Sequence, residues 1–154
     1  MGCEIERKFL IDPAKWQKPE KGVRIMQGYL IRSEGLSLRL RLADDKAFLT
    51  LKGACKGISR SEFEYEIPPE DLEAMLKEFG SGKYISKTRY YEQVGDHRWE
   101  IDIFEGENAG LAVAEIELQS EDETFELPAW VTEEVSGDFR YRNAYLVENP
   151  YSRW

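Results

Sequence analysis

Residues 3–10 read Cys-Glu-Ile-Glu-Arg-Lys-Phe-Leu and form the first predicted strand. Successive side chains of a strand point to opposite faces, so Glu4, Glu6 and Lys8 share one face while apolar Phe9 lies on the other. An ordinary half-buried strand turns its polar face to solvent, and this segment alone fits that pattern. The interpretation changes because the same arrangement recurs along the chain.

Seven further strands are predicted where polar and apolar residues alternate, at 23–32, 36–42, 46–52, 60–67, 83–94, 97–105 and 111–119. Their polar faces carry charges two residues apart: Arg39 and Arg41, Lys52, Glu62 and Glu64, Lys87 and Arg89, Glu100 and Asp102, and Glu115 and Glu117. The opposite faces are apolar, as at Leu38 and Leu40, and have to be covered. If the eight strands close, the core lies outside an antiparallel β-barrel and the charges line a tunnel.

Helices are predicted to cover parts of this sheet. Leu72, Met75, Leu76 and Phe79 are spaced for an amphipathic helix over 70–79, after Pro68-Pro69. Shorter helices are expected at 14–16, 128–135 and 142–148. The fold class is therefore α+β, as a single domain over residues 1–154.

Composition limits the classes of partner. The chain has 154 residues, with 42% hydrophobic and 33% charged residues, which is typical of a soluble globular protein. A net charge of −9 disfavours nucleic acid and anionic membranes as partners of the whole surface. Two isolated cysteines, the lack of an apolar run of roughly 18 residues and the lack of a leader predict a cytoplasmic protein.

The predicted lumen has its own chemistry, with six basic and eight acidic side chains. Arginine and lysine suit the oxygens of a polyphosphate, and carboxylates suit a hard divalent cation such as Mg²⁺ or Mn²⁺. Together they predict a site for a metal-bound polyphosphate. The alternative is that opposite charges neutralise one another in a solvated open sheet.

The sequence resembles the triphosphate tunnel metalloenzymes of the CYTH superfamily, whose first strand carries Glu-x-Glu-x-Lys, here residues 4–8. The resemblance spans the chain and continues at Gln27-Gly28-Tyr29-Leu30, Arg39-x-Arg41, Leu51-Lys52, Glu62-x-Glu64, Lys87-x-Arg89, Glu100-x-Asp102, Glu115-x-Glu117 and Arg140-Tyr141-x-Asn143. It implies a tunnel that binds a linear triphosphate with Mg²⁺ or Mn²⁺. It also implies that the helix expected at 142–148 plugs one mouth.

The resemblance implies a role for each matching residue. The phosphate contacts would be Lys8, Arg39, Arg41, Lys52, Lys87 and Arg89, and the metal ligands Glu4, Glu6, Glu115 and Glu117. Catalytic roles would fall to Lys8, Lys52, Lys87, Glu62 and Glu64, the last two as candidate general bases, with Tyr29, Glu100 and Asp102 in support. His97 is expected to be exposed and without a catalytic role. Lys56 and Arg60 are placed in a solvated loop, with the tunnel mouth as the alternative.

Three functions remain open at this stage. The first is metal-dependent hydrolysis of inorganic tripolyphosphate, as a monomer or homodimer acting on a small molecule. The second is hydrolysis of an organic triphosphate such as thiamine triphosphate or a nucleotide, or cyclisation of ATP as in class IV adenylyl cyclases. The third is a non-catalytic polyphosphate-binding module, although none of the expected metal ligands is missing.

Overall fold

A computed structural model describes residues 3–154 as a strongly curved antiparallel sheet with a few short helices. The strands are β1 (Glu4–Ile11), β2 (Val23–Arg32), β3 (Leu36–Ala43), β4 (Lys46–Gly53), β5 (Ser59–Arg60), β6 (Glu62–Ile67), β7 (Ile85–Val94), β8 (His97–Phe104), β9 (Ala112–Glu117) and β10 (Val131–Glu134). The helices are α1 (Pro69–Phe79) and α2 (Asn143–Leu146), with 3-10 turns at Pro13–Lys15, Gly106–Asn108, Phe139–Tyr141 and Tyr151–Arg153. None of these helices is long and apolar enough to cross a membrane.

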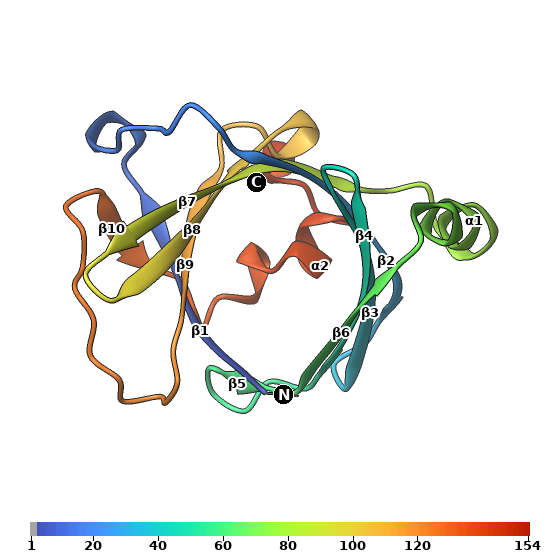
Figure 1. Ribbon diagram of the computed structural model, residues 1–154, viewed down its shortest axis with the longest axis horizontal. Helices are drawn as coiled ribbons and strands as arrows, with labels where there is room; N and C mark the ends of the chain where they lie inside the picture. The colour runs from blue at the N-terminus through green and yellow to red at the C-terminus, as the bar shows by residue number, and fades with distance from the viewer. Residues whose placement is uncertain (1–2) are drawn as a thin grey trace.

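The strands follow the order β10-β1-β9-β8-β7-β2-β3-β4-β6 and curve into a ring (Figure 1). The end strand β6 does not pair with β1. Instead the short β5 does, with Arg60 opposite Glu4 and Ser59 opposite Ile5. The predicted antiparallel, sheet-dominated fold is confirmed, but the sheet is not closed along its length and the described residues form ten strands instead of eight.

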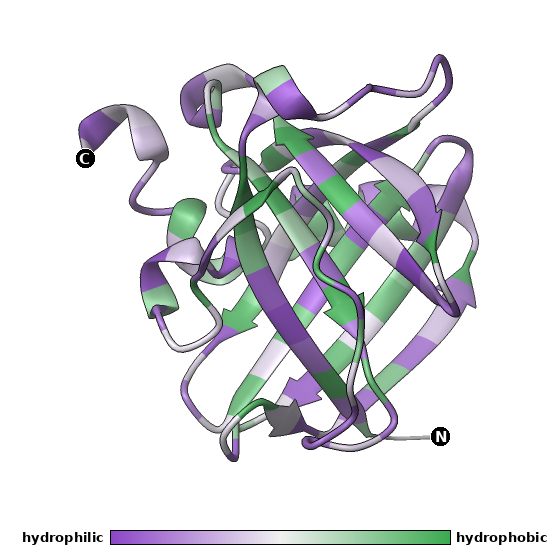
Figure 2. Ribbon diagram, turned by 90° about the vertical axis from the view of Figure 1, so that its left-hand side faces the viewer, coloured by the Kyte–Doolittle hydropathy of each residue, from purple (hydrophilic) through white to green (hydrophobic). Residues whose placement is uncertain are grey.

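Alternation places the apolar core outside the ring, as the sequence predicts, and Figure 2 shows hydrophilic and hydrophobic bands alternating along the strands. On one side, α1 covers β2, β3 and β4 through Leu72, which packs with Leu40 and Ala47. Gly28 on β2 permits this close approach, because an added Cβ would lie 3.1 Å from Leu76 Cδ2. On the other side, aromatic Trp99 and Trp130 belong to a cluster over β1, β8 and β9.

A third apolar cluster lies at one end of the inner face, although the charge pattern of the sequence predicts a face that is charged throughout. Ile85, Phe104 and Val113 share faces with charged neighbours on β7, β8 and β9, and they pack with Leu146 and Val147. Figure 1 shows α2 inside the ring. The expected C-terminal helix therefore exists in a shorter form, and its apolar side chains pack against this end of the inner face.

One predicted helix is wrong. Residues 128–135 do not form a helix, because Val131–Glu134 is the strand β10, whose Glu134 pairs with Phe9 and whose Val131 pairs with Ile11 of β1. The β-branched pair Val131 and Thr132 fits a strand, and the free edge of β1 supplies partners that local periodicity does not reveal. The predicted strand 60–67 is also interrupted, at Ser61, between β5 and β6.

The packing of α2 gives a test of stability. Leu146 is 1% exposed, so Leu146→Ala should lower the free energy of unfolding by about 2–5 kcal/mol, through lost burial and the cavity left behind. Leu127 is 58% exposed, and Leu127→Ala should change it by less than about 0.5 kcal/mol. Urea unfolding of the two variants measures the difference, and equal stabilities would contradict the assignment of α2 to the core.

Candidate functional site

The ring encloses a cavity of about 790 Å³. Most of the charged residues singled out from the sequence line it, together with Tyr29: Glu4, Glu6, Lys8, Arg39, Arg41, Lys52, Glu62, Glu64, Arg89, Glu100, Glu115 and Glu117. Lys87 and Asp102 share the same inner face but are buried beneath the lining. The structure thus gathers these predicted residues around one space, while their roles stay predictions.

Strand register explains why opposite charges meet inside the ring. Directly opposed residues of an antiparallel pair point to the same face, so Lys8 of β1 meets Glu115 of β9, and Lys52 of β4 meets Glu62 of β6. The Lys8 Nζ to Glu115 Oε1 distance is 3.9 Å, and Lys52 Nζ to Glu62 Oε2 is 3.4 Å. Lys52 also donates to Glu4 Oε1 at 3.0 Å. This last contact links β4 to β1 across the gap where β6 does not pair with β1.

Glu6 and Glu115 form a carboxyl pair at the centre of the predicted metal site. Burial, together with the charges of Glu115 and Glu4, raises the pKa of Glu6 well above its usual value. Burial acts against ionisation of Glu115 too, but Lys8, Arg89 and a hydrogen bond from Glu6 outweigh it and lower the pKa of Glu115 to about 2. The two opposite shifts fit a hydrogen bond that the Glu6 carboxyl donates to the Glu115 carboxylate.

The carboxylate oxygens of the predicted metal site suit a hard cation, although Glu4 and Glu115 contact lysines in this structure. Burial and neighbouring acids also raise the pKa values of Glu4 and Glu117, so positive charge is favoured among these oxygens. Within residues 3–154, however, no three His, Cys, Asp or Glu side chains are arranged to hold a metal ion. Glu4 instead contacts Lys52, and Glu115 contacts Lys8.

The arginines of β3 leave donors without acceptors. Arg39 donates to Thr50 Oγ1 at 3.2 Å and to Glu64 Oε2 at 3.4 Å, but its Nε is buried without a hydrogen-bond partner. Burial, with Arg39 and Arg89 close by, lowers the pKa of Arg41 to about 10. Positive charge is therefore in local excess here, which an anion would relieve.

Lys87 occupies a buried network. Its Nζ lies 2.7 Å from Asp102 Oδ2 and 3.2 Å from Asn143 Oδ1, and Asp102 Oδ1 accepts from Arg89 Nε at 2.8 Å. Burial lowers the pKa of Lys87 to about 7, while Arg89 and Lys87 overcome burial and hold the pKa of Asp102 far below its usual range. The lining residue Asn143 caps Lys87, so Lys87 does not face the cavity here.

The segment before α2 supplies lining residues that charge alternation could not find. Arg142, Asn143 and Tyr145 line the cavity, and Lys8 Nζ donates to the Tyr141 carbonyl at 3.1 Å. The resemblance pointed to Arg140-Tyr141-x-Asn143 as a motif but not to the Asn143 contact. A packing contact between residues so distant in sequence leaves no local pattern.

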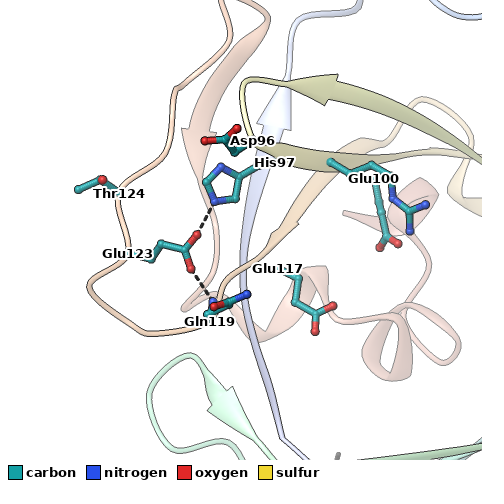
Figure 3. A pocket seen from close by; sticks show the side chains of 8 residues that line it. Asp96, His97, Glu100, Glu117, Gln119, Glu123 and Thr124 are labelled. Atoms are coloured by element: carbon teal, nitrogen blue, oxygen red, sulfur yellow. Dashed lines mark hydrogen bonds and ion pairs between the residues drawn. The ribbon is translucent and has the colours of Figure 1, made fainter.

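A second pocket of about 550 Å³ adjoins the cavity, because Glu100 and Glu117 line both. In Figure 3 these two side chains lie across the pocket from Glu123. His97 Nε2 is 2.5 Å from Glu123 Oε2, and Glu123 Oε1 accepts from the Gln119 backbone N–H at 2.6 Å. The structure thus pairs His97, which is part-buried instead of exposed, with the 119–124 loop.

Comparison with known proteins places this charged cavity in a family. The sequence pattern of the CYTH domain matches residues 2–147, which is nearly the whole chain. The chain belongs to the CYTH family. A CYTH relative from Acetivibrio thermocellus named inorganic triphosphatase is 44% identical over 154 residues, covering 100% of this chain and 99% of that protein. Another from Nitrosomonas europaea, with the same name, is 39% identical over 149 residues, covering 94% and 96%.

Solved structures of other proteins have the same fold. The crystal structure of an inorganic triphosphatase superposes with a TM-score of 0.65 at 36% identity, covering 93% of this chain and 96% of the other. A putative adenylate cyclase from Bacillus halodurans superposes with a TM-score of 0.64 at 17% identity, covering 79% and 84%. The second likeness shows a shared fold alone.

Replacing either member of the Glu6 and Glu115 pair by Gln should change the free energy of unfolding in opposite directions. Glu6→Gln should raise the free energy of unfolding near neutral pH by about 0.5–2 kcal/mol, because the amide N–H can still donate to Glu115 without a buried charge. Glu115→Gln should lower it by about 1–3 kcal/mol, since Lys8 loses its carboxylate partner.

The effect of Glu6→Gln should depend on pH in a defined direction. A carboxyl with a raised folded-state pKa stabilises the fold below its unfolded pKa, and this stabilisation is lost as pH rises through the folded value. The advantage of the Gln variant should therefore grow as the pH rises above the ordinary carboxyl pKa of about 4.3. Thermal unfolding of the wild type and of Glu6→Gln over this range of pH measures it, and a constant advantage would contradict the raised pKa of Glu6.

Proposed function

We propose that the protein is a divalent-metal-dependent triphosphatase that releases phosphate from inorganic tripolyphosphate. Two full-length CYTH relatives named inorganic triphosphatase, at 44% and 39% identity, carry the proposal. The cavity supports it chemically, because buried bases and acids line one space large enough for a small anion with its counter-ions. Phosphoryl transfer requires positioning and charge neutralisation more than covalent assistance, which suits such a lining.

Substrate binding falls to the basic side chains of the cavity. Lys8, Arg39, Arg41, Lys52 and Arg89 would contact the phosphoryl oxygens. The buried, unpaired Arg39 Nε and the lowered pKa of Arg41 both favour an anion at this place. Lys87 is covered by Asn143, so we assign it, with Asp102, to holding Arg89 and the inner wall in position.

The metal ligands would be Glu4 and Glu6 on β1 and Glu115 and Glu117 on the adjacent strand β9. All are oxygen donors, as Mg²⁺ and Mn²⁺ prefer, and a bound cation would favour the ionised form of Glu6, whose pKa is raised in its absence. A divalent ion would neutralise charge on the phosphates and polarise the reacting phosphoryl group.

Glu62 and Glu64 are better suited to orienting cations than to accepting a proton. Despite burial, the hydrogen bond from Glu4 and the charge of Lys52 lower the pKa of Glu62. A general base works best with a pKa near the working pH, so a lowered pKa weakens that role. Glu64 accepts from Thr50 at 2.7 Å and contacts Arg39 at 3.4 Å, so it holds Arg39.

A substrate panel tests the reaction. Inorganic triphosphate with Mg²⁺ or Mn²⁺ should release phosphate faster than pyrophosphate, ATP or thiamine triphosphate, and EDTA should stop the release. Glu4→Gln should reduce turnover by about 100-fold or more, because it removes a ligand charge but keeps the shape. Phosphate and cyclic AMP are both quantified. Cyclic AMP as the main product would favour the cyclase, and binding without turnover would favour a polyphosphate-binding module.

Arg39 tests the anion site separately from chemistry. Arg39→Ala should weaken triphosphate binding by about 10–100-fold, because a buried guanidinium that would grip phosphate oxygens is lost. Arg153→Ala removes the same charge from a side chain 67% exposed, and its affinity should match the wild type. Isothermal titration calorimetry gives both affinities, and equal values would contradict the predicted role of Arg39.

A further inference from the structure

Arg60 differs from most basic residues around the cavity in having no carboxylate partner. Lys8, Arg39, Lys52 and Arg89 each lie within 4.0 Å of an acidic oxygen. No such contact exists for Arg60 in the part of the chain that the structure describes. Its Nη1 reaches only Cys55 Sγ, at 3.6 Å, and its Nε is buried without a hydrogen-bond partner. Sulfur is a weak acceptor, so this guanidinium has no strong acceptor from the protein.

The position of Arg60 aims it at the cavity. It ends β5, where it is paired directly with Glu4 of β1, and opposed residues share one face of a sheet. Arg60 is accordingly part of the cavity lining, with Gly57 and Ile58 from the preceding loop. Glu4 in turn contacts Lys52 at 3.0 Å, so Arg60 adjoins the proposed phosphate site.

The neighbouring carboxylates do not serve as acceptors for Arg60. Glu4 accepts twice from Lys52, at 3.0 and 3.3 Å, and Glu62 lies 3.4 Å from the same ammonium group. A planar guanidinium with several free N–H groups matches two oxygens of a phosphoryl group in a bidentate contact. A ligand oxygen in the cavity is therefore the acceptor that the site lacks.

We propose that Arg60 forms a further phosphate subsite on β5, beside Lys52. This subsite holds one phosphoryl group of a linear polyphosphate, the group that lies nearest the 53–60 loop. The subsite rests on the proposed function for the identity of its ligand. It adds a binding residue from β5, beside β1, at a position that is expected from the sequence to lie in a solvated loop.

The place of β5 in the ring gives this subsite a preference for longer chains. β5 pairs with β1, and along the paired strands β1, β9 and β8 lie between it and β7, which carries Arg89; Figure 1 shows β5 and β7 at different parts of the ring. Neighbouring strands are about 4.8 Å apart, so the walls at β5 and β7 are well separated. A short anion contacts one of these two walls, whereas a longer chain extends further from one toward the other. Arg60 should matter more for triphosphate than for pyrophosphate.

Calorimetry in EDTA, which prevents metal-dependent turnover, measures the subsite. Arg60→Gln should weaken triphosphate binding by about 10–100-fold and pyrophosphate binding by less. Arg60→Lys, which keeps the charge but loses the fork, should fall between Arg60→Gln and the wild type. Arg153→Gln is the charge-matched control and should bind like the wild type. An Arg60→Gln affinity equal to that control, or equal losses for both anions, overturns the proposal.

Cys55 gives a local readout that is independent of activity. In a Cys3→Ser background, Cys55 is the remaining thiol, exposed and in contact with Arg60. Triphosphate should slow its alkylation by iodoacetamide about tenfold, and Arg60→Gln should remove this protection. Unprotected Cys55 with saturating triphosphate would contradict a ligand at Arg60. Near-native thermal unfolding of Arg60→Lys ensures a folded variant for comparison.

The outcomes separate this subsite from the proposed function. A wild type that binds triphosphate through Arg60 but releases no phosphate contradicts the triphosphatase and leaves the subsite. A wild type that releases phosphate, with Arg60→Gln binding normally, contradicts the subsite alone. A wild type that binds no triphosphate contradicts both.

Discussion

Pairing of opposite charges across neighbouring strands is the constraint on which the rest of this structure depends. A buried ion without a partner costs several kcal/mol, so an inner face rich in acids and bases is tolerable only when the register brings opposite signs together. Arg89 and Asp102 illustrate this, with Nε and Oδ1 2.8 Å apart and almost no exposure. Register and charge are therefore inseparable here, because a slip by one residue would turn these side chains outward and the apolar faces inward.

Charge pairing on the inner face is incomplete, and the groups left without full partners lie around the cavity. Acids gather on β1 and β9, where burial and the neighbouring acids raise the pKa of Glu6, and bases gather on β3, where burial and neighbouring arginines lower the pKa of Arg41. If every acid were paired with a base, no charge would be left to bind a ligand. The separation of the two signs instead leaves one region suited to a cation and another suited to an anion.

Much of this could be predicted from sequence because alternation is a local signal. The inner positions of Glu4, Arg39 and Glu115 follow from period-two patterning alone, as does the outer position of Leu40. The strand at 131–134 was missed because its existence depends on an edge of β1 more than a hundred residues away in sequence. Asn143 was missed for the same reason, since its contact with Lys87 is set by how the end of the chain packs.

The central place of β1 has a consequence for the order in which the chain can assemble. β1 is synthesised before the other strands described here, yet β9 and β10, which pair with it along most of its length, begin at residues 112 and 131. Phe9 and Ile11 therefore stay without their native cover until the last third of the chain is made. Hairpins such as β3-β4 and β7-β8 join residues close in sequence and can form early, whereas contacts that close long loops form slowly. The strand that begins the sequence is thus among the last to find its place, and ring formation waits for it.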